Sequence, residues 1–320
     1  MKDQMKDQMK DQAKKTVPVF FAADENYLPY LAVSLHSLKA NASKDYAYKI
    51  HVLHSGMDGS ATEKIKSYSE SWFEISFEDV SEKLHTISDS LHIRDYYTCS
   101  TYYRIFIAGM FPEYEKAVYL DSDTVVLGDI SKLYERDLQD NLIAAVPDGA
   151  VGVVEPFKIY TKEVLGISAE NYFNAGVILM NLKRFREVDF YGKFHSLLKR
   201  YRFIVAQDQD YLNVICKDQV SFLPEKWNTM PIAKKVEKPE IVHYNLTMKP
   251  WKKDGIFYEE YFWAYAKQTE FYEDIVKEKE SFTPEMEEAD KKVEEGLIAL
   301  CLEEAARQDN YRRKYGKNQG

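Results

Sequence analysis

Short apolar runs alternate with helical patterns along the first part of the chain. Four runs have the length and character of buried strands: residues 17–23, 50–53, 73–77 and 117–120. Three intervening segments repeat apolar residues at helical spacing: residues 28–38, 61–68 and 102–108. Strands and helices in alternation predict an α/β fold with a mostly parallel central sheet that helices cover on both faces.

The later part of the chain is richer in helical patterns. Further strands are predicted at residues 176–182 and 240–244, and further helices at residues 190–201, 208–216 and 284–313. The N-terminus repeats the charged tetrapeptide MKDQ with no apolar stretch after it, which is typical of a solvated tail. We therefore expect three parts: a tail over residues 1–15, one α/β domain over 16–257 and a helical extension over 258–320.

Composition and charge narrow the range of functions. Of 320 residues, 45% are hydrophobic and 30% are charged, which is typical of a globular protein with a sizeable core. The formal net charge of -9 disfavours binding to the polyphosphate backbone of nucleic acids. Three widely spaced cysteines predict neither a disulfide framework nor a zinc site. With no secretory signal and no apolar run of about 20 residues, we expect a cytoplasmic protein.

The clearest candidate for chemistry is the sequence Asp121-Ser122-Asp123. It follows the apolar run 117–120 and precedes the apolar run 125–127, so it lies at the end of a predicted buried strand. Two carboxylates at this spacing can bind one divalent cation. Such a cation can bind the diphosphate of a nucleotide sugar and stabilise its departure. The alternative interpretation is a solvated turn, which has no need of two apolar runs around it.

A third metal ligand and a phosphate contact are predicted further along the chain. His243 follows a short apolar run, and its imidazole could complete the coordination of a cation, although a lone histidine is more often structural. Lys249 follows six residues later and could contact a diphosphate as a point charge.

Two other segments carry polar groups suited to a sugar. In Gln207-Asp208-Gln209-Asp210, carboxylates alternate with amides, which suits sugar hydroxyls and a cationic sugar centre, but acidic residues are also favoured at a helix N-terminus. Asn174-Ala175-Gly176 places small residues before a predicted strand. They would let a ligand approach the backbone closely, or they form a tight turn.

Together these motifs resemble glycosyltransferase family 8. The resemblance is carried by six blocks in the order typical of that family: FAADENY (21–27), YYRI (102–105), VYLDSDTVV (118–126), YFNAGVILMNLKRF (172–185), QDQD (207–210) and HYNLTMKPW (243–251). The resemblance as a whole covers residues 17–251, most of the chain. The resemblance implies a GT-A fold, a UDP-hexose donor, manganese or magnesium as cofactor, and retention of the anomeric configuration.

The resemblance also implies roles for individual residues. At the nucleotide, Asp24 and Asn26 would bind uracil, Tyr27 would stack on it, Ala22 would line its pocket, and Ser122 would meet the ribose through its backbone. At the metal, the implied ligands are Asp121, Asp123 and His243. At the donor sugar and diphosphate, the implied contacts are Arg104, Asp121, Asn174, Ala175, Asp208, Gln209 and Lys249.

One position departs from the family pattern. Many members carry Gly three residues after the metal-binding His, where this chain has Leu246. Either a backbone contact to phosphate is lost there, or the loop has a different shape. His243, Lys249, Pro250 and Trp251 keep their spacing, so we expect activity to be retained.

The predicted mechanism places Gln209, Asp208 and Asp121 in catalytic roles. The acceptor hydroxyl would attack from the face that UDP leaves, and Gln209 or Asp208 would stabilise the cationic sugar. The alternative is a covalent glycosyl-enzyme, for which Gln209 would be a poor nucleophile. Glucose and galactose stay equally open as the donor sugar, and a glycan, a lipid-linked glycan or a glycoprotein as the acceptor.

Three other functions and one further partner are compatible with parts of this sequence to different degrees. A nucleotidyltransferase would need a Gly-rich, basic triphosphate loop, which is not seen after the first predicted strand. A UDP-sugar-binding scaffold without turnover and a glycogenin-like self-glucosylating protein stay open. The basic and aromatic segment 311–317 could contact an anionic membrane at the inner face, although a solvated tail explains it as well.

Overall fold

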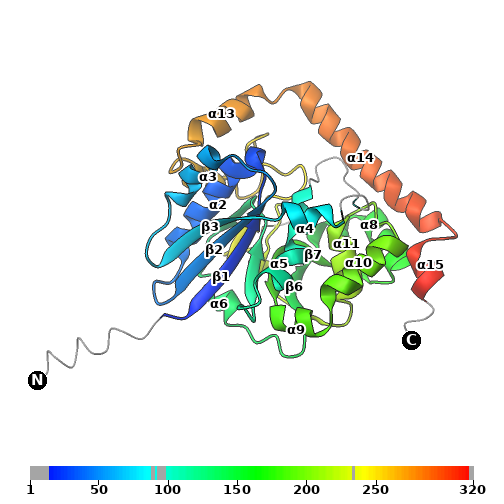
Figure 1. The fold of residues 1–320 in the computed structure, drawn as a ribbon. Coiled ribbons are helices and arrows are strands. Elements are labelled where there is room, and N and C mark those ends of the chain that lie inside the picture. Colours follow the sequence, from blue (N-terminus) through cyan, green and yellow to red (C-terminus); the bar gives the residue numbers. More distant parts are fainter. Residues whose placement is uncertain (1–13, 88–90, 92–98, 233–234, 317–320) are drawn as a thin grey trace, which may run out of the picture.

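The computed structural model describes residues 14–87, 91, 99–232 and 235–316. Its centre is a seven-stranded sheet (Figure 1). In spatial order the strands are β3 (Phe73–Asp79), β2 (Ala47–His54), β1 (Thr16–Ala22), β4 (Ala117–Leu120), β7 (Phe173–Met180), β6 (Ile143–Pro147) and β8 (Val220–Phe222). Of these described strands, β7 runs antiparallel to its neighbours β4 and β6, and the other pairings are parallel. The predicted mostly parallel sheet is therefore confirmed.

Alternation along the strands divides the core between the two faces of the sheet. In β1, Val19 and Phe21 pack into one apolar cluster, whereas Phe20 and Ala22 pack into the other. The first cluster includes side chains of α2 (Leu28–Asn41), α3 (Gly59–Lys66), α12 (Glu259–Ala266) and α13 (Tyr272–Ser281). The second includes those of α5 (Ile107–Met110), α9 (Leu182–Glu187), α10 (Phe190–Arg200) and α11 (Asp208–Ile215).

A small second sheet joins two segments that are far apart in the sequence. Strand β5 (Thr124–Val126) pairs antiparallel with β9 (Ile241–His243), and Thr124 is opposite His243. Since β5 begins directly after Asp123, this pairing fixes His243 beside the acidic turn.

The sheet opens locally at Pro147. The register between β6 and β7 shifts between Ala145 and Pro147, and proline has no N–H with which to continue the ladder. The backbone of β7 from Asn174 to Gly176 is therefore available for contacts outside the β6–β7 ladder.

The C-terminal extension runs across the molecule from one side to the other. Helix α13 contacts α2, and α14 (Pro284–Ala306) packs along α8 (Glu155–Tyr160) at the opposite side (Figure 1). Thr283 caps α14 by accepting a hydrogen bond from the backbone N–H of Met286 at 3.3 Å, and Pro284 occupies the first turn. The helix predicted over 284–313 was wrong in one respect: it ends at Ala306, and Asn310 caps a separate helix, α15 (Tyr311–Tyr315).

Other predicted elements need smaller corrections. The helix expected at 102–108 is a 3₁₀ segment, η3 (Cys99–Phe106), followed by α5. The strand expected to begin at Gly176 begins at Phe173, so Asn174 and Ala175 lie inside a strand and not in a turn. Strands β6 and β8 were not predicted. The remaining described elements are η1 (Glu25–Tyr27), α4 (Ser81–His85), α6 (Ser131–Tyr134), α7 (Gly149–Val153), η4 (Thr161–Leu165), η5 (Ala169–Asn171) and η6 (Glu225–Trp227).

The predictions about the N-terminal tail, a membrane-spanning run and the segment 311–317 can be compared with the structure only within the described residues. Most of the predicted tail, residues 1–13, and Lys317 lie outside the described residues. Within the described part, no helix combines the length and apolarity that a bilayer span requires. In α15, the Tyr311 ring is buried against Tyr201 and Phe203.

Candidate active site

A cleft of about 640 Å³ lies at the carboxyl ends of β1 and β4. From β1 the chain continues through β2 and β3 towards one edge of the sheet, whereas β4 and the later strands lie towards the other edge. Open α/β sheets bind ligands at such a switch point between neighbouring strands. The cleft is lined by nearly all residues that the sequence singled out: Ala22, Asn26, Tyr27, Arg104, Asp121, Ser122, Asp123, Asn174, Ala175, Asp208, Gln209, His243 and Lys249. The exception is Asp24, whose carboxylate caps η1 by accepting from the backbone N–H of Tyr27 at 3.2 Å.

The acidic turn is anchored to three neighbouring strands. The backbone N–H of Asp121 donates to the carbonyl oxygen of Gly176 in β7 at 2.8 Å. The hydroxyl of Ser122 donates to the carbonyl oxygen of Ala22 in β1 at 2.8 Å, and Thr124 continues into β5. These bonds hold the turn rigidly, so both carboxylates have fixed directions.

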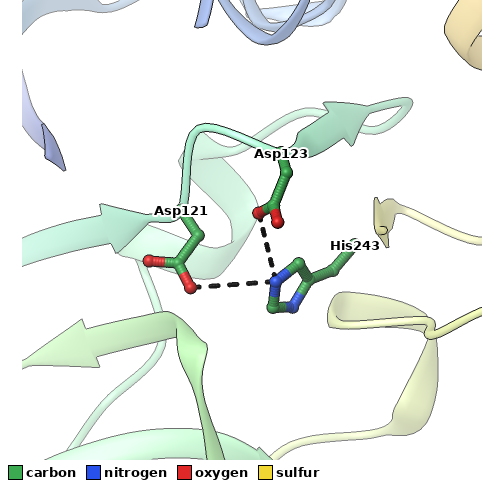
Figure 2. Close-up of side chains that lie close together, drawn as sticks. All are labelled: Asp121, Asp123 and His243. Carbon is green, nitrogen blue, oxygen red and sulfur yellow. Dashed lines mark ion pairs between the residues drawn. The ribbon is translucent and has the colours of Figure 1, made fainter. Parts of the chain in front are cut away.

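Asp121, Asp123 and His243 converge on one point (Figure 2). The His243 Nε2 atom lies 3.7 Å from Asp121 Oδ2 and 3.2 Å from Asp123 Oδ1. The three candidate ligand atoms all lie within 4.8 Å of one another. Two carboxylate oxygens and an imidazole nitrogen at these separations could bind a divalent cation.

A relay of amide groups fixes the orientation of His243. The Asn174 amide nitrogen donates to Asp148 Oδ2 at 2.9 Å, and the Asn228 amide nitrogen donates to Asn174 Oδ1 at 2.9 Å. The Asn228 Oδ1 atom is thereby turned towards His243 Nδ1, 3.1 Å away. Nδ1 is thereby placed to donate a hydrogen bond to Asn228, and Nε2 faces the carboxylates. Metal-binding histidines are commonly oriented by such a second hydrogen bond.

Two observations on the residues themselves fit a cation at this point. Asp123 Oδ1 is buried and accepts no hydrogen bond from the described residues, which is costly for a carboxylate unless another positive partner is supplied. Gly176 lines the same point, and a Cβ there would lie 2.2 Å from His243 Cε1 and 2.8 Å from Asp121 Oδ2. The space between the three ligands therefore exists because residue 176 has no side chain.

Lys249 is the cation nearest to this cluster among the described contacts. Its ammonium is buried, is paired with Asp123 Oδ2 and donates to the carbonyl oxygen of Tyr244 at 2.6 Å. Burial by itself raises the pKa of the Asp123 carboxyl, but Lys249 and His243 outweigh it and hold that pKa well below its usual range. Asp123 is therefore ionised at neutral pH, as a metal ligand must be.

Arg104 connects the acidic turn to the end of the cleft where the resemblance expects the donor sugar, called the sugar end below. Its guanidinium, 3% exposed, lies 3.0 Å from Asp121 Oδ1 and 3.1 Å from Asp208 Oδ2. It also donates to the carbonyl oxygen of Ala175 and lies over the Tyr119 ring at 4.3 Å. The planar fork of arginine can make these contacts together, which a lysine ammonium could not.

Gln209 lies at the floor of the sugar end. Its Oε1 accepts from the backbone N–H of Ala175 at 2.9 Å, and its Nε2 is 3.2 Å from both Asp148 Oδ2 and the Tyr172 hydroxyl. The amide orientation is therefore set by the backbone of β7. The Asp208 carboxylate is paired with Arg104, so it can influence a bound ligand through the position of that guanidinium.

An aromatic pair forms the other end of the cleft. Tyr30 and Trp251 stack with their ring centroids 3.9 Å apart, and Tyr27 meets Tyr30 edge-on at 5.4 Å. Tyr27, exposed Asn26 and this pair line the cleft on the side where the resemblance expects the base.

Leu246 keeps the backbone shape that a glycine would adopt. Its φ of 50° is in the left-handed region, which costs a residue with a side chain about 1 kcal/mol or more. Leu246 thus takes a backbone conformation that a glycine would adopt without strain. The Leu246 side chain lines the cleft, where a glycine would leave space.

Sequence reasoning missed two residues of the amide relay. Asp148 follows the strand β6 just as Asp121 follows β4, but β6 itself was not predicted, so this position gave no signal. Asn228 lies in an irregular segment after η6 with no local signal, and only its contact with His243 identifies it.

Comparison with known proteins agrees with the predicted resemblance. The model of glycosyl transferase family 8 matches residues 18–255. A putative glycosyltransferase of Haemophilus influenzae is 29% identical over 251 residues, which are 75% of this chain and 74% of that protein. The lipopolysaccharide 1,2-glucosyltransferase of Escherichia coli is 26% identical over 265 residues, again 75% of this chain and 74% of that protein.

Solved structures confirm the predicted GT-A fold. The galactosyltransferase LgtC, solved in complex with donor and acceptor sugar analogues, matches with a TM-score of 0.70 and 29% identity, over 79% of this chain and 96% of LgtC. The bifunctional glycosyltransferase WbbM matches with a TM-score of 0.71 and 26% identity, over 83% of this chain. This chain spans about half of WbbM, 52% of its length.

The contacts of Gly176 predict that a single methyl group disrupts the cation site. In Gly176→Ala, the Cβ would force His243 or Asp121 to move. We expect Mn²⁺ affinity, measured by calorimetry in the presence of UDP, to fall on the order of tenfold to a hundredfold. Thermal unfolding should show a loss of about 1–3 kcal/mol. Gly109→Ala is the matched control, because a Cβ there meets nothing within 4 Å. Unchanged Mn²⁺ affinity in Gly176→Ala would contradict the assignment.

The environment of Asp208 predicts a pH-dependent stability. Burial raises the pKa of this carboxyl to about 7, against a partly opposing effect of Arg104. Between about pH 4 and 7 the folded protein keeps a proton that the unfolded chain has lost, so stability decreases as the pH rises through this window.

Asp208→Asn stays neutral and should not show this decrease. Between pH 5 and pH 8 its free energy of unfolding should gain about 2 kcal/mol relative to the wild type, whatever the absolute cost of losing the contact with Arg104. Urea unfolding at both pH values measures this. The control is the exposed Asp140→Asn. A difference between Asp208→Asn and wild type that is constant with pH would refute the prediction.

Proposed function

Because the chain belongs to glycosyl transferase family 8, we propose that it transfers a hexose, glucose or galactose, from a UDP-sugar to a glycan, lipid-linked glycan or glycoprotein with retention of configuration. The observation that carries the proposal is the convergence of Asp121, Asp123, His243 and Lys249 in a single cleft. Two relatives are named as glucosyl- and galactosyltransferases of lipopolysaccharide. Their names support a hexose donor and a cell-surface glycan as acceptor.

The donor would lie along the cleft from the aromatic pair to Gln209. Asn26, Asp24 and Tyr27 would hold the uracil, with Ala22 and the backbone of Ser122 beside the nucleoside. The diphosphate would then reach the carboxylate cluster and Lys249. The hexose would contact the groups at the sugar end: Arg104, Asp121, Asn174, Ala175, Asp208 and Gln209.

Asp121, Asp123 and His243 would hold a divalent cation, manganese or magnesium, which supplies charge neutralisation for the diphosphate as it leaves. Lys249 would exchange its partner when the donor binds. Its ammonium now pairs with Asp123 and would turn to a phosphate oxygen, where it stabilises the leaving group.

The acceptor hydroxyl would attack the anomeric carbon from the face that the diphosphate leaves. Its proton would pass to the departing phosphate oxygen, so no protein base is required. Asp208 is paired with Arg104 and the Gln209 amide is engaged by Ala175, Asp148 and Tyr172. Such fixed dipoles and charges support electrostatic stabilisation of a cationic sugar better than attack on it by a protein nucleophile.

We propose a catalytic unit over residues 16–257, an extension over 258–320 and a cytoplasmic location. Peripheral contact with an anionic membrane would use Arg313 and Lys314, which are exposed. Co-sedimentation with anionic vesicles should then decrease on replacing both by serine, and equal sedimentation would end this part of the proposal.

Release of UDP tests the donor half of the reaction without knowledge of the acceptor. We expect release from UDP-glucose or UDP-galactose with Mn²⁺ and its loss with a chelator. Asp123→Asn should lower it roughly hundredfold or more, because several kcal/mol of stabilisation are removed. Asp140→Asn should match the wild type.

The other outcomes separate the remaining alternatives. Binding of UDP-sugar without any transfer, also with acceptor extracts, would favour a scaffold. Hexose units added to the protein itself, seen by intact mass, would favour self-glucosylation. If the protein neither binds nor releases UDP, the proposal is overturned.

A further inference from the structure

The helix α14 lies beyond the part of the chain that the family model matches, yet it reaches the cleft. The match ends at residue 255, and α14 begins at Pro284. Leu297 of α14 is among the residues that line the cleft, together with Leu246 and Lys249. The extension therefore contributes to the wall of the site.

Acidic residues of α14 hold the segment that carries Lys249. The Thr247 hydroxyl donates to Glu294 Oε1, and the Lys252 ammonium lies 3.2 Å from Asp290 Oδ2. Asp290 and Glu294 are four residues apart, so they lie on the same face of the helix. These contacts flank Lys249 on both sides along the chain.

A third contact reaches the same segment from α13. The Tyr30 hydroxyl donates to Glu278, and the Tyr30 ring stacks on Trp251. Figure 1 shows that α13 and α14 follow one another above the sheet, joined by a short connection. The segment 245–252 is thus held at several points, by α14 directly and by α13 through Tyr30.

The segment needs such support because its backbone is strained. Leu246 has a φ of 50°, a conformation that a side chain disfavours and that persists only where surrounding contacts impose it. The next residue, Thr247, is 1% exposed, and its carbonyl oxygen accepts from the backbone N–H of Lys249 at 2.9 Å. A displacement of Thr247 is therefore passed directly to Lys249.

We propose that α14 is part of the active site, and that Glu294, supported by Asp290, is a positioning residue that holds Lys249 in place for the diphosphate. This inference rests on the proposed function, since Lys249 is assigned to the diphosphate there. Glu294 touches no reacting atom. It acts through Thr247 and the short backbone turn that joins Thr247 to Lys249.

Paired substitutions on both sides of the contact test the proposal. Glu294→Ala removes the acceptor of the Thr247 hydroxyl, and Thr247→Val removes the donor at nearly constant volume. Each should raise the Kd for UDP with Mn²⁺, measured by calorimetry, and the KM for the UDP-sugar about fivefold to tenfold. The double variant should be no worse than either single one, because both remove the same contact.

Two further variants separate positioning from general stability. Glu294→Gln keeps an oxygen that can accept the hydroxyl, so it should restore most of the affinity. Glu295→Ala, an exposed neighbour on the same helix, should bind UDP and turn over like the wild type. Thermal unfolding of all variants identifies any that fail to fold, and Asp290→Asn then replaces them as a milder probe of the same segment.

The results distinguish this inference from the proposed function. One outcome would overturn the role of α14 and leave the glycosyltransferase proposal intact. In it, the wild type binds and releases UDP, and the variants Glu294→Ala, Thr247→Val and Asp290→Asn bind UDP with the same affinity as the wild type. Additive losses in the double variant would also overturn that role. No UDP binding by the wild type would instead remove the proposed function on which the inference rests.

Discussion

Arg104 places a guanidinium among carboxylates in a part of the cleft from which water is largely excluded. Without it, the buried carboxylate of Asp208 and the partly buried carboxylate of Asp121 would lose the guanidinium that pairs with both of them, a costly change. Its contacts join η3 to the turn after β4, to the backbone of β7 and to the start of α11. Arg104 therefore fixes the Asp121–Asp123–His243 cluster relative to the end of the cleft at α11.

The Asp121–Asp123–His243 cluster is oriented from the opposite side by a chain of hydrogen bonds. Asp148, Asn174 and Asn228 form a directional relay, in which each amide is turned by the group before it, and the relay ends at Nδ1 of His243. Asp148 and Asn174 also border the sugar end, through Gln209 and the backbone of Gly176. Asp148 therefore takes part both in the relay that orients His243 and in the contacts that orient Gln209.

Local patterns predicted the parts of the fold that local forces determine. Strand β4 is fully buried and continuously apolar, and the acidic turn after it was therefore visible. Strand β6, with two alanines and a proline, has no pattern that separates it from a helix or loop. The break at residues 307–310 was missed because its signal is a single Asn cap: Asn310 begins a new helix, α15, after α14 has ended at Ala306. The convergence of Asp123 and His243 depends on the β5–β9 pairing across more than a hundred residues. The residues alone suggested His243 only as a candidate third ligand, and the family resemblance implied the complete set.

The left-handed backbone at residue 246 can be obtained in two ways. A glycine adopts it without cost but leaves the chain free to leave it again. A leucine adopts it only against a steric penalty, which contacts elsewhere must offset, and it gains a side chain that lines the cleft. The contacts available include those of α13 and α14, which lie outside the family-matched region. In this chain the shape of the segment 245–252 therefore depends in part on tertiary contacts with its own C-terminal extension.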